Sequence, residues 1–269
     1  MADNYIESIE ANVGGTKQDV PVRDAEAVHV FGNAGSHNSI YRGNNLGSSV
    51  TQDQWNAIEA GTFDDLYIGD YWVIGGVNWR IAAFDYYYNT GDTAFTKHHA
   101  VIVPDTSLYN AQMNDTATTD GGYAGSKMYT EGLEQAKSTI NSAFGTSHVL
   151  SHRILLTNAV SNGYPSAGAW VNSTVDLMCE QMVYGGAIFM PMPNGAVTPY
   201  NYRVEKSQLP LFQHDHSKMS IRSSWWLRDV VTAANFARVG SYGDAAYGGA
   251  AYGAGSNLFG VRPAFCIGV

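Results

Sequence analysis

The pattern of apolar and polar residues predicts two helices in the N-terminal half of the chain. The first begins with a Thr-x-x-Gln capping box at Thr51, carries Trp55 and Ile58 on one face, and ends at Gly61. In such a box the hydroxyl and the amide side chain satisfy each other's free backbone groups, and glycine is a common helix stop. The second helix covers residues 126–144, where an apolar residue recurs every three or four positions.

Runs of β-branched and aromatic residues predict a sheet. Residues 66–74 and 77–82 lie on either side of Gly75-Gly76, which is a hairpin pattern. Further elements are expected at residues 84–88, 100–103 and 151–160, and residues 176–184 fit either a helix or a strand. Residues 1–48 contain three glycine-rich breaks and are expected to pack poorly, although 27–31 could form a strand in an assembly.

Composition narrows the possible functions. The chain has 269 residues, 45% of them apolar, which suits one large domain or one domain with an arm. The net charge is −9 with no Lys/Arg cluster, so nucleic acid and anionic membranes are not expected partners. No apolar run is long enough to span a membrane, and the first residues lack the features of a signal peptide. We therefore expect synthesis in a cytoplasm without membrane insertion.

The last forty-odd residues are the most informative. A bulky frame, 224–228 and 260–265, encloses a stretch of Tyr, Gly, Ala, Ser and Asn. Antibody-type binding loops use Tyr for wide contact and small residues for adaptability. Between Asp229 and Phe259 there is no Lys, Glu, Gln, Met or Trp. A codon that ends in C or T cannot encode any of these five residue types. The segment is interpreted as a binding face diversified at Asn-type codons; a Gly/Ala-rich loop that lacks these types by chance is the alternative.

Several motifs occur in an order that resembles a known group of proteins. They are residues 68–72, 79–82, 176–180, 184–185, 225–228 and 260–265. Together they resemble a phage domain similar to the C-type-lectin-like fold of formylglycine-generating enzymes, of the variable proteins of diversity-generating retroelements and of phage tail receptor-binding proteins. The resemblance implies an α+β domain over residues 63–269 with a variable region at about 229–259. Residues 1–62 would be an N-terminal extended arm for assembly or virion attachment.

The resemblance also implies roles for individual residues. Trp225, Trp226, Arg228, Arg262 and Phe265 would form the structural frame, in which the aromatic rings anchor the core and the arginines pair with buried carboxylates or carbonyls. The expected ligand-binding residues are Asn235, Arg238, Tyr242, Asp244, Tyr247, Tyr252, Asn257 and Leu258. The predicted function is a hypervariable receptor-binding protein at a phage tail tip, in the virion. It would be a homotrimer that recognises a bacterial surface protein or glycan, without enzymatic activity or cofactor.

Other chemistry was weighed against this prediction. His98-His99 and His214-Asp215-His216 suggest metal ligands. The sequence places no third ligand at a suitable spacing, and polar residues in surface loops explain both pairs better. An oxidoreductase of the formylglycine-generating type would need a cysteine pair for copper, whereas Cys266 and Cys179 are far apart in the sequence. Residues 86–88, three tyrosines, could stack on a sugar but fit a strand with alternating faces. A virion structural protein that binds nothing specific is the third alternative.

Overall fold

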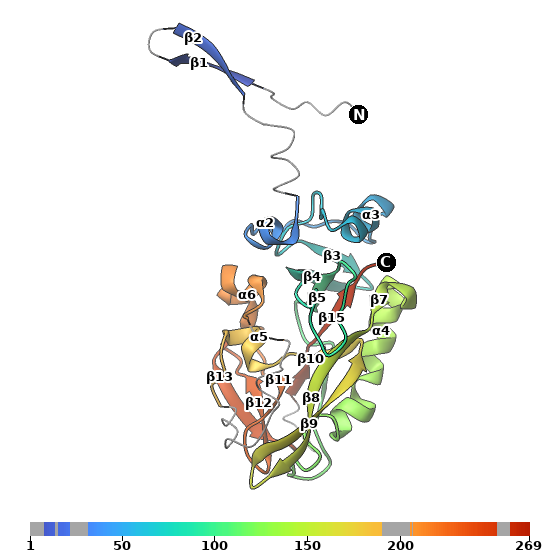
Figure 1. The fold of residues 1–269 in the computed structure, drawn as a ribbon. Coiled ribbons are helices and arrows are strands. Elements are labelled where there is room, and N and C mark those ends of the chain that lie inside the picture. Colours follow the sequence, from blue (N-terminus) through green and yellow to red (C-terminus); the bar gives the residue numbers. More distant parts are fainter. Residues whose placement is uncertain (1–7, 14–15, 22–31, 190–204, 206, 252–258) are drawn as a thin grey trace.

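The computed structural model describes residues 8–13, 16–21, 32–189, 205, 207–251 and 259–269 (Figure 1). This part of the chain is α+β, as predicted, with two larger sheets and short helices. The helices are α2 (Ala34–Asn38), α3 (Gln52–Ala60), α4 (Glu134–Phe144), α5 (Glu180–Tyr184) and α6 (Pro210–His214). No helix within these ranges is long and apolar enough to cross a membrane.

The six-stranded sheet forms the centre of the molecule. Its strands are β10 (Val175–Leu177), β15 (Pro263–Ile267), β5 (Ala100–Pro104), β4 (Val77–Phe84) and β3 (Tyr71–Ile74), with β7 (Val149–Leu150) also paired to β15. All pairs are antiparallel, and every residue of β5, β10 and β15 is buried. Helix α4 closes one side, because the Phe144 ring packs edge-on against Trp79 (5.7 Å) and Phe265 (5.4 Å).

The five-stranded sheet carries the C-terminal segment. Its order is β13 (Ala245–Gly249), β12 (Asn235–Val239), β11 (Trp225–Val230), β14 (Phe259–Val261) and β6 (Tyr109–Ala111). β11 and β14 are parallel, with Trp225 opposite Gly260, and the other pairs are antiparallel. Only Arg262 separates β14 from β15, so the chain passes directly from this sheet into the central one.

Two further hairpins complete the described structure. β8 (His152–Ser161) pairs with β9 (Tyr164–Ser173), and β1 (Ser8–Val13) pairs with β2 (Thr16–Pro21). Each forms a two-stranded sheet of its own. The remaining turns are a π-helical turn at Met128–Gly132 and 3-10 turns at Thr146–His148 and His216–Met219.

The helix and hairpin predictions are confirmed. At α3 both capping-box bonds are present, from Gln54 N to the Thr51 hydroxyl (3.3 Å) and from Thr51 N to the Gln54 side chain (3.0 Å). Gly61 ends the helix with a positive φ of 70°. The hairpin turns at Gly75-Gly76, residues 100–103 lie in β5, and residues 151–160 lie almost wholly in β8. The helix expected over residues 126–144 begins with the π-helical turn and continues as α4.

Two strand predictions are wrong. Residues 66–70, expected to belong to the first strand of the hairpin, lie outside β3, which begins at Tyr71. Residues 84–88 do not extend the sheet, because β4 ends at Phe84 and Asp85 adopts a positive φ of 53°. The Asp85 carboxylate accepts a hydrogen bond from His99 N (2.9 Å), and Tyr88 N donates to Asp85 O (3.1 Å), so the chain turns there. Residues 176–184, which fitted a helix or a strand, contain both: most of β10 and all of α5.

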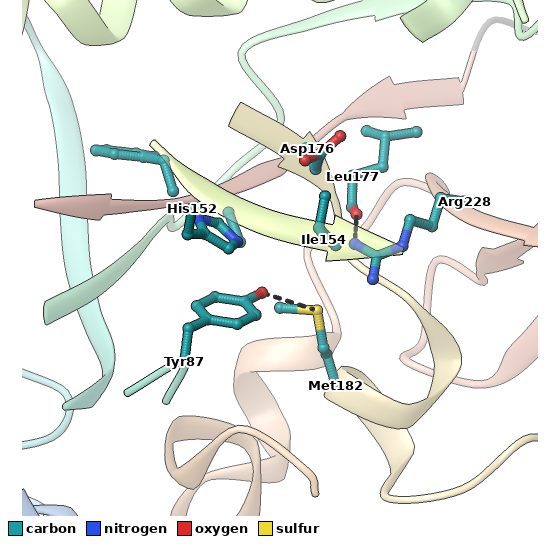
Figure 2. A pocket seen from close by; sticks show the side chains of 9 residues that line it. Tyr87, His152, Ile154, Asp176, Leu177, Met182 and Arg228 are labelled. Carbon is teal, nitrogen blue, oxygen red and sulfur yellow. Dashed lines mark hydrogen bonds between the residues drawn. The ribbon is translucent and has the colours of Figure 1, made fainter. Parts of the chain in front are cut away.

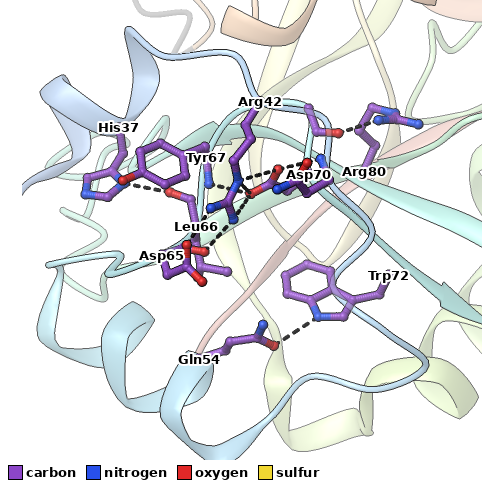
Figure 3. A network of polar contacts seen from close by, with 11 residues as sticks. His37, Arg42, Gln54, Asp65, Leu66, Tyr67, Asp70, Trp72 and Arg80 are labelled. Atoms are coloured by element: carbon purple, nitrogen blue, oxygen red, sulfur yellow. Dashed lines mark hydrogen bonds and ion pairs between the residues drawn. The ribbon is translucent and has the colours of Figure 1, made fainter. Parts of the chain in front are cut away.

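Residues 32–61 pack against the central sheet, so the expectation of poor packing is wrong for residues 32–48. The buried Asp70 carboxylate receives the Arg42 guanidinium (2.7 Å) and the backbone N–H groups of Asn44 (2.8 Å) and Tyr67 (2.9 Å), as Figure 3 shows. Trp55 belongs to the same hydrophobic core as the central sheet. The packed unit therefore begins before residue 63, and the expected strand at 27–31 lies outside the described residues.

Candidate ligand-binding face

The frame begins with two buried tryptophans, Trp225 and Trp226, on β11. Consecutive strand residues point to opposite faces of a sheet, so one ring covers each face. Trp225 Nε1 donates to Met219 O (3.1 Å), and Trp226 Nε1 donates to Ala111 O (2.8 Å). Each ring thus buries its apolar surface while its N–H has a partner, as a buried indole requires. The sequence could not tell which ring points inward; both do.

Arg228 pairs with a buried carboxylate. Its Nη2 lies 2.6 Å from Glu205 Oε1, and its Nη1 donates to Leu177 O (3.0 Å). Both side chains are almost completely removed from solvent. Burial opposes the charged form, but the Glu205 carboxylate outweighs it and the pKa of Arg228 is raised. A buried charge is tolerated when it is paired and hydrogen-bonded in this way.

Arg262 is held by carbonyl groups instead. Its Nε donates to Pro104 O and its Nη1 to Lys218 O, both at 2.8 Å, and its guanidinium lies 4.9 Å from the centroid of the Trp225 ring. Burial lowers the pKa of Arg262 to about 10. Phe265 is buried in β15. The five frame residues are therefore all core residues.

The interpretation of residues 229–259 as a binding face without core positions needs correction, because part of this segment is buried. Phe236, Ala237 and Val239 of β12 are fully buried. The physical reason is that β12 is an interior strand, flanked by β11 and β13. Within the described part of this segment, the exposed positions lie at the β11–β12 turn, at the β12–β13 turn and on β13.

Among the predicted binding residues that the structure describes, Tyr242 is 81% exposed and Tyr247 is 50% exposed. Tyr242 lies in the turn between β12 and β13, where Gly240 N donates to Asp244 O (2.7 Å). Asp244 is also exposed. A Tyr ring in such a position offers both apolar contact and a hydroxyl to a ligand.

The other predicted binding residues differ. Asn235 is half-buried, and its side-chain amide donates to the Thr232 hydroxyl (2.7 Å). Arg238 donates to the Ser224 hydroxyl (2.7 Å) and to Tyr247 O (3.0 Å), so it supports β13 from the neighbouring strand. The remaining three, Tyr252, Asn257 and Leu258, lie outside the described residues.

Ile188 and Phe189, which follow α5, are a second contributor to this face that was not predicted from the sequence. Their backbone N–H groups donate to the buried Glu180 carboxylate at 2.8 and 3.0 Å. Glu180 N in turn donates to Asp229 Oδ2 on β11 (2.5 Å). The frame strand β11 and the loop after α5 are therefore joined through the buried carboxylates of Asp229 and Glu180. A lone Glu in the apolar run 177–183 was the available signal.

This connection brings Phe189 against the predicted face. The Phe189 and Tyr247 ring centroids are 5.3 Å apart with an interplanar angle of 72°. Ile188 is 51% exposed and Phe189 36% exposed. We call Ile188, Phe189 and Tyr247 the aromatic corner. The Tyr184 hydroxyl adds a further link by donating to Gly243 O (3.2 Å) in the β12–β13 turn.

Behind the frame lies a small polar cavity, shown in Figure 2, with a volume of about 10 Å³. Its lining includes Tyr87, His152, Asp176 and Arg228. Such a volume is close to the minimum that holds a single water molecule, so it does not accommodate a substrate. Burial raises the pKa of Asp176 to about 6 and lowers that of His152 to about 4.

The histidine pairs do not form a metal site in the described residues, where no three His, Cys, Asp or Glu side chains are suitably grouped. His98 contacts Asp85 (2.7 Å), while His99 is buried and burial lowers its pKa to about 4. His214 ends α6 and His216 begins a 3-10 turn, so the two residues do not share one strand face.

Two other groups have structural surroundings. Cys179 and Cys266 are buried free thiols, and burial raises the pKa of Cys266, which disfavours the reactive thiolate. Tyr87 is buried and Tyr88 stacks on His98 (4.7 Å), so the three tyrosines at 86–88 do not form a flat sugar platform.

Comparisons of the chain with family models, with curated proteins and with solved structures found no match.

Proposed function

We propose that this chain is a ligand-binding protein of the receptor-binding type, with a C-type-lectin-like fold, located at a phage tail tip. Its ligand is a molecule on the bacterial surface. The observation that carries the proposal is the contrast within one sheet between the fully buried frame on β11 and the exposed Tyr242 and Tyr247 on the neighbouring hairpin. Binding residues can vary on such a support without loss of the fold.

Additional features support the proposal. The exposed tyrosines belong to the segment that lacks five residue types, and Tyr is enriched among residues that dominate binding energies. Within the described part of the chain, the hairpin β1–β2 forms a two-stranded sheet of its own, and an isolated two-stranded sheet is marginally stable in water. We assign it to assembly of a homotrimer or to virion attachment. Several copies on one particle would convert weak single contacts into avidity.

Cell adsorption of the purified protein tests this function. A labelled wild-type protein is mixed with a panel of bacterial strains, and the cell-bound fraction is measured. Replacement of Tyr242, Tyr247 and Tyr252 by Ala is expected to abolish adsorption, because truncation of one such residue commonly costs about 2 kcal/mol or more. The melting temperature is expected to stay nearly unchanged.

Tyr164→Ala provides the matched control. Tyr164 is 49% exposed on β9, as exposed as Tyr247, but lies outside the 229–259 segment. This variant is expected to adsorb like the wild type. The proposal fails if the wild type adsorbs to no strain, or if the triple variant adsorbs as well as the wild type.

A further inference from the structure

The aromatic corner has a shape that selects among ligands. Because the Phe189 and Tyr247 rings meet at 72° with centroids 5.3 Å apart, they form two walls of a corner and not one flat surface. Sugar recognition commonly uses an exposed aromatic face on which a pyranose ring lies flat. A corner instead surrounds a compact apolar group from two sides, and exposed Ile188 adds aliphatic surface next to it in sequence.

The Tyr247 hydroxyl is the one polar side-chain group among the three residues of the aromatic corner, which offers few other hydrogen-bond donors. The backbone N–H groups of Ile188 and Phe189 are both taken by the Glu180 carboxylate. The Tyr247 carbonyl accepts from Arg238 (3.0 Å), and Arg238 is further engaged by the Ser224 hydroxyl. A glycan presents several hydroxyl groups that need partners when water is removed. Ile188 and Phe189 have no polar side-chain atoms, so the surface matches an apolar group better.

Charge adds a second constraint on the partner. Asp244 is exposed three residues before Tyr247, while Arg238 packs over the Phe259 ring (4.7 Å) and donates to groups within the fold. The chain as a whole carries a net charge of −9. This net negative charge favours the approach of a basic partner surface and raises the association rate.

We propose that the aromatic corner binds an apolar side chain of a bacterial surface protein, next to a basic residue of that protein. This inference rests on the proposed receptor-binding function and specifies its ligand class. It also assigns a binding role to Ile188 and Phe189, which lie outside the segment 229–259. Glu180 acts as a positioning residue, since its carboxylate holds the backbone of both.

Treatment of the target cells distinguishes the ligand classes. Cells of an adsorbing strain are exposed either to proteinase K or to periodate, which oxidises sugar diols, and adsorption of the wild-type protein is then measured. Proteinase K is expected to remove adsorption and periodate to leave it intact. Loss after periodate alone, or after neither treatment, overturns the inference but leaves the receptor-binding function in place. Absence of adsorption before any treatment overturns the receptor-binding function itself.

Variants test the corner directly. Phe189→Ser and Tyr247→Ser are each expected to lower the apparent affinity for untreated cells by about tenfold or more, as loss of a central aromatic contact does. Tyr164→Ser is the control and is expected to bind like the wild type. Asp244→Asn is expected to weaken binding about twofold and to reduce its dependence on salt. Unchanged binding of both corner variants, with melting temperatures equal to the wild type, overturns the assignment.

Discussion

Strands β11 and β13 belong to the same sheet but differ in almost every property. All six residues of β11 are buried, and they include two tryptophans and an arginine in an ion pair. β13 consists of Ala, Gly and one Tyr, and only Gly248 is buried. Strand β11 lies between β12 and β14, whereas β13 pairs with β12 alone among the strands that the structure describes.

The difference shows how one sheet can separate stability from recognition. Large side chains with satisfied polar groups concentrate the folding free energy on β11, because buried apolar area is the main stabilising contribution. The exposed Tyr247 on β13 contributes little to the core, so its replacement should cost little, whereas a side chain at the buried Gly248 would meet the Phe259 ring. Glu180 links the two strands indirectly, because it joins Asp229 of β11 to the loop that carries Phe189, and the Phe189 ring contacts Tyr247 of β13.

The largest expected effect is in the frame. Trp226→Ala removes a fully buried ring and the hydrogen bond to Ala111 O, so the free energy of unfolding should fall by about 3–5 kcal/mol. Trp225→Ala should fall in the same range, because its ring is equally buried. Denaturant unfolding measures both. If the free energy of unfolding hardly changes for either variant, β11 does not make the large contribution to stability assigned to it.

Two arginines one strand apart allow a sharper test. Arg228→Ala leaves the Glu205 carboxylate buried without its cation, and loss of one partner of a buried pair typically costs about 3–5 kcal/mol. Arg238→Ala on β12 breaks hydrogen bonds at a half-buried site without an ion pair and should cost about 1 kcal/mol. Urea unfolding of both variants checks this order. Equal losses would show that the ion pair has no special weight.

Acid should destabilise the region behind the frame through His152. Its pKa in the folded protein is about 4, below the usual 6.5, so its contribution to stability is complete above pH 6.5 and is lost as pH falls through 4. The shift corresponds to about 3 kcal/mol. Because burial raises the pKa of Asp176 and acts in the opposite direction, the difference between His152→Phe and the wild type is the quantity to measure.

Urea unfolding at pH 7 and pH 4 gives that difference. The stability of the wild type relative to His152→Phe should decrease on acidification, since the variant has no proton to take up at this site. His216→Gln is the control, because His216 is exposed. A difference that does not change with pH would mean that His152 does not titrate within the core.

The smallest expected effect is on β13. Tyr247→Ser should change the free energy of unfolding by less than about 0.5 kcal/mol, as at other exposed positions. Thermal melts beside Trp226→Ala complete the comparison. A loss for Tyr247→Ser as large as for Trp226→Ala would show that its contact with Phe189 is part of the core.

Local signals were sufficient for much of the fold. Thr51 and Gly61 carry a helix start and stop that depend on adjacent residues alone, and the Gly75-Gly76 hairpin is equally local. In the candidate site, the exposure of Tyr242 and Tyr247 also followed from their small neighbours.

Non-local contacts were not predictable in the same way. Whether Phe236 is buried depends on β11 and β13 lying on either side of it, which a single strand pattern does not reveal. Poor packing was predicted around Arg42 because its ion-pair partner Asp70 is 28 residues away in the sequence, so that no local pattern reveals the pair. Phe189 meets Tyr247 only because Glu180 and Asp229, 49 residues apart, are hydrogen-bonded.

The single residue between β14 and β15 has a mechanical consequence. A pull on the hairpin β12–β13 reaches β11 and then β14 through the strand ladder, and β14 continues through Arg262 into β15. β15 is paired on both sides, with β5 and β10, so tension arriving there is shared between two ladders and does not peel one edge strand. At the junction, the Arg262 guanidinium donates hydrogen bonds to the carbonyl groups of Pro104 and Lys218, which fix its position. A force applied to the exposed hairpin β12–β13 is therefore transmitted through few residues to the buried strands of the central sheet.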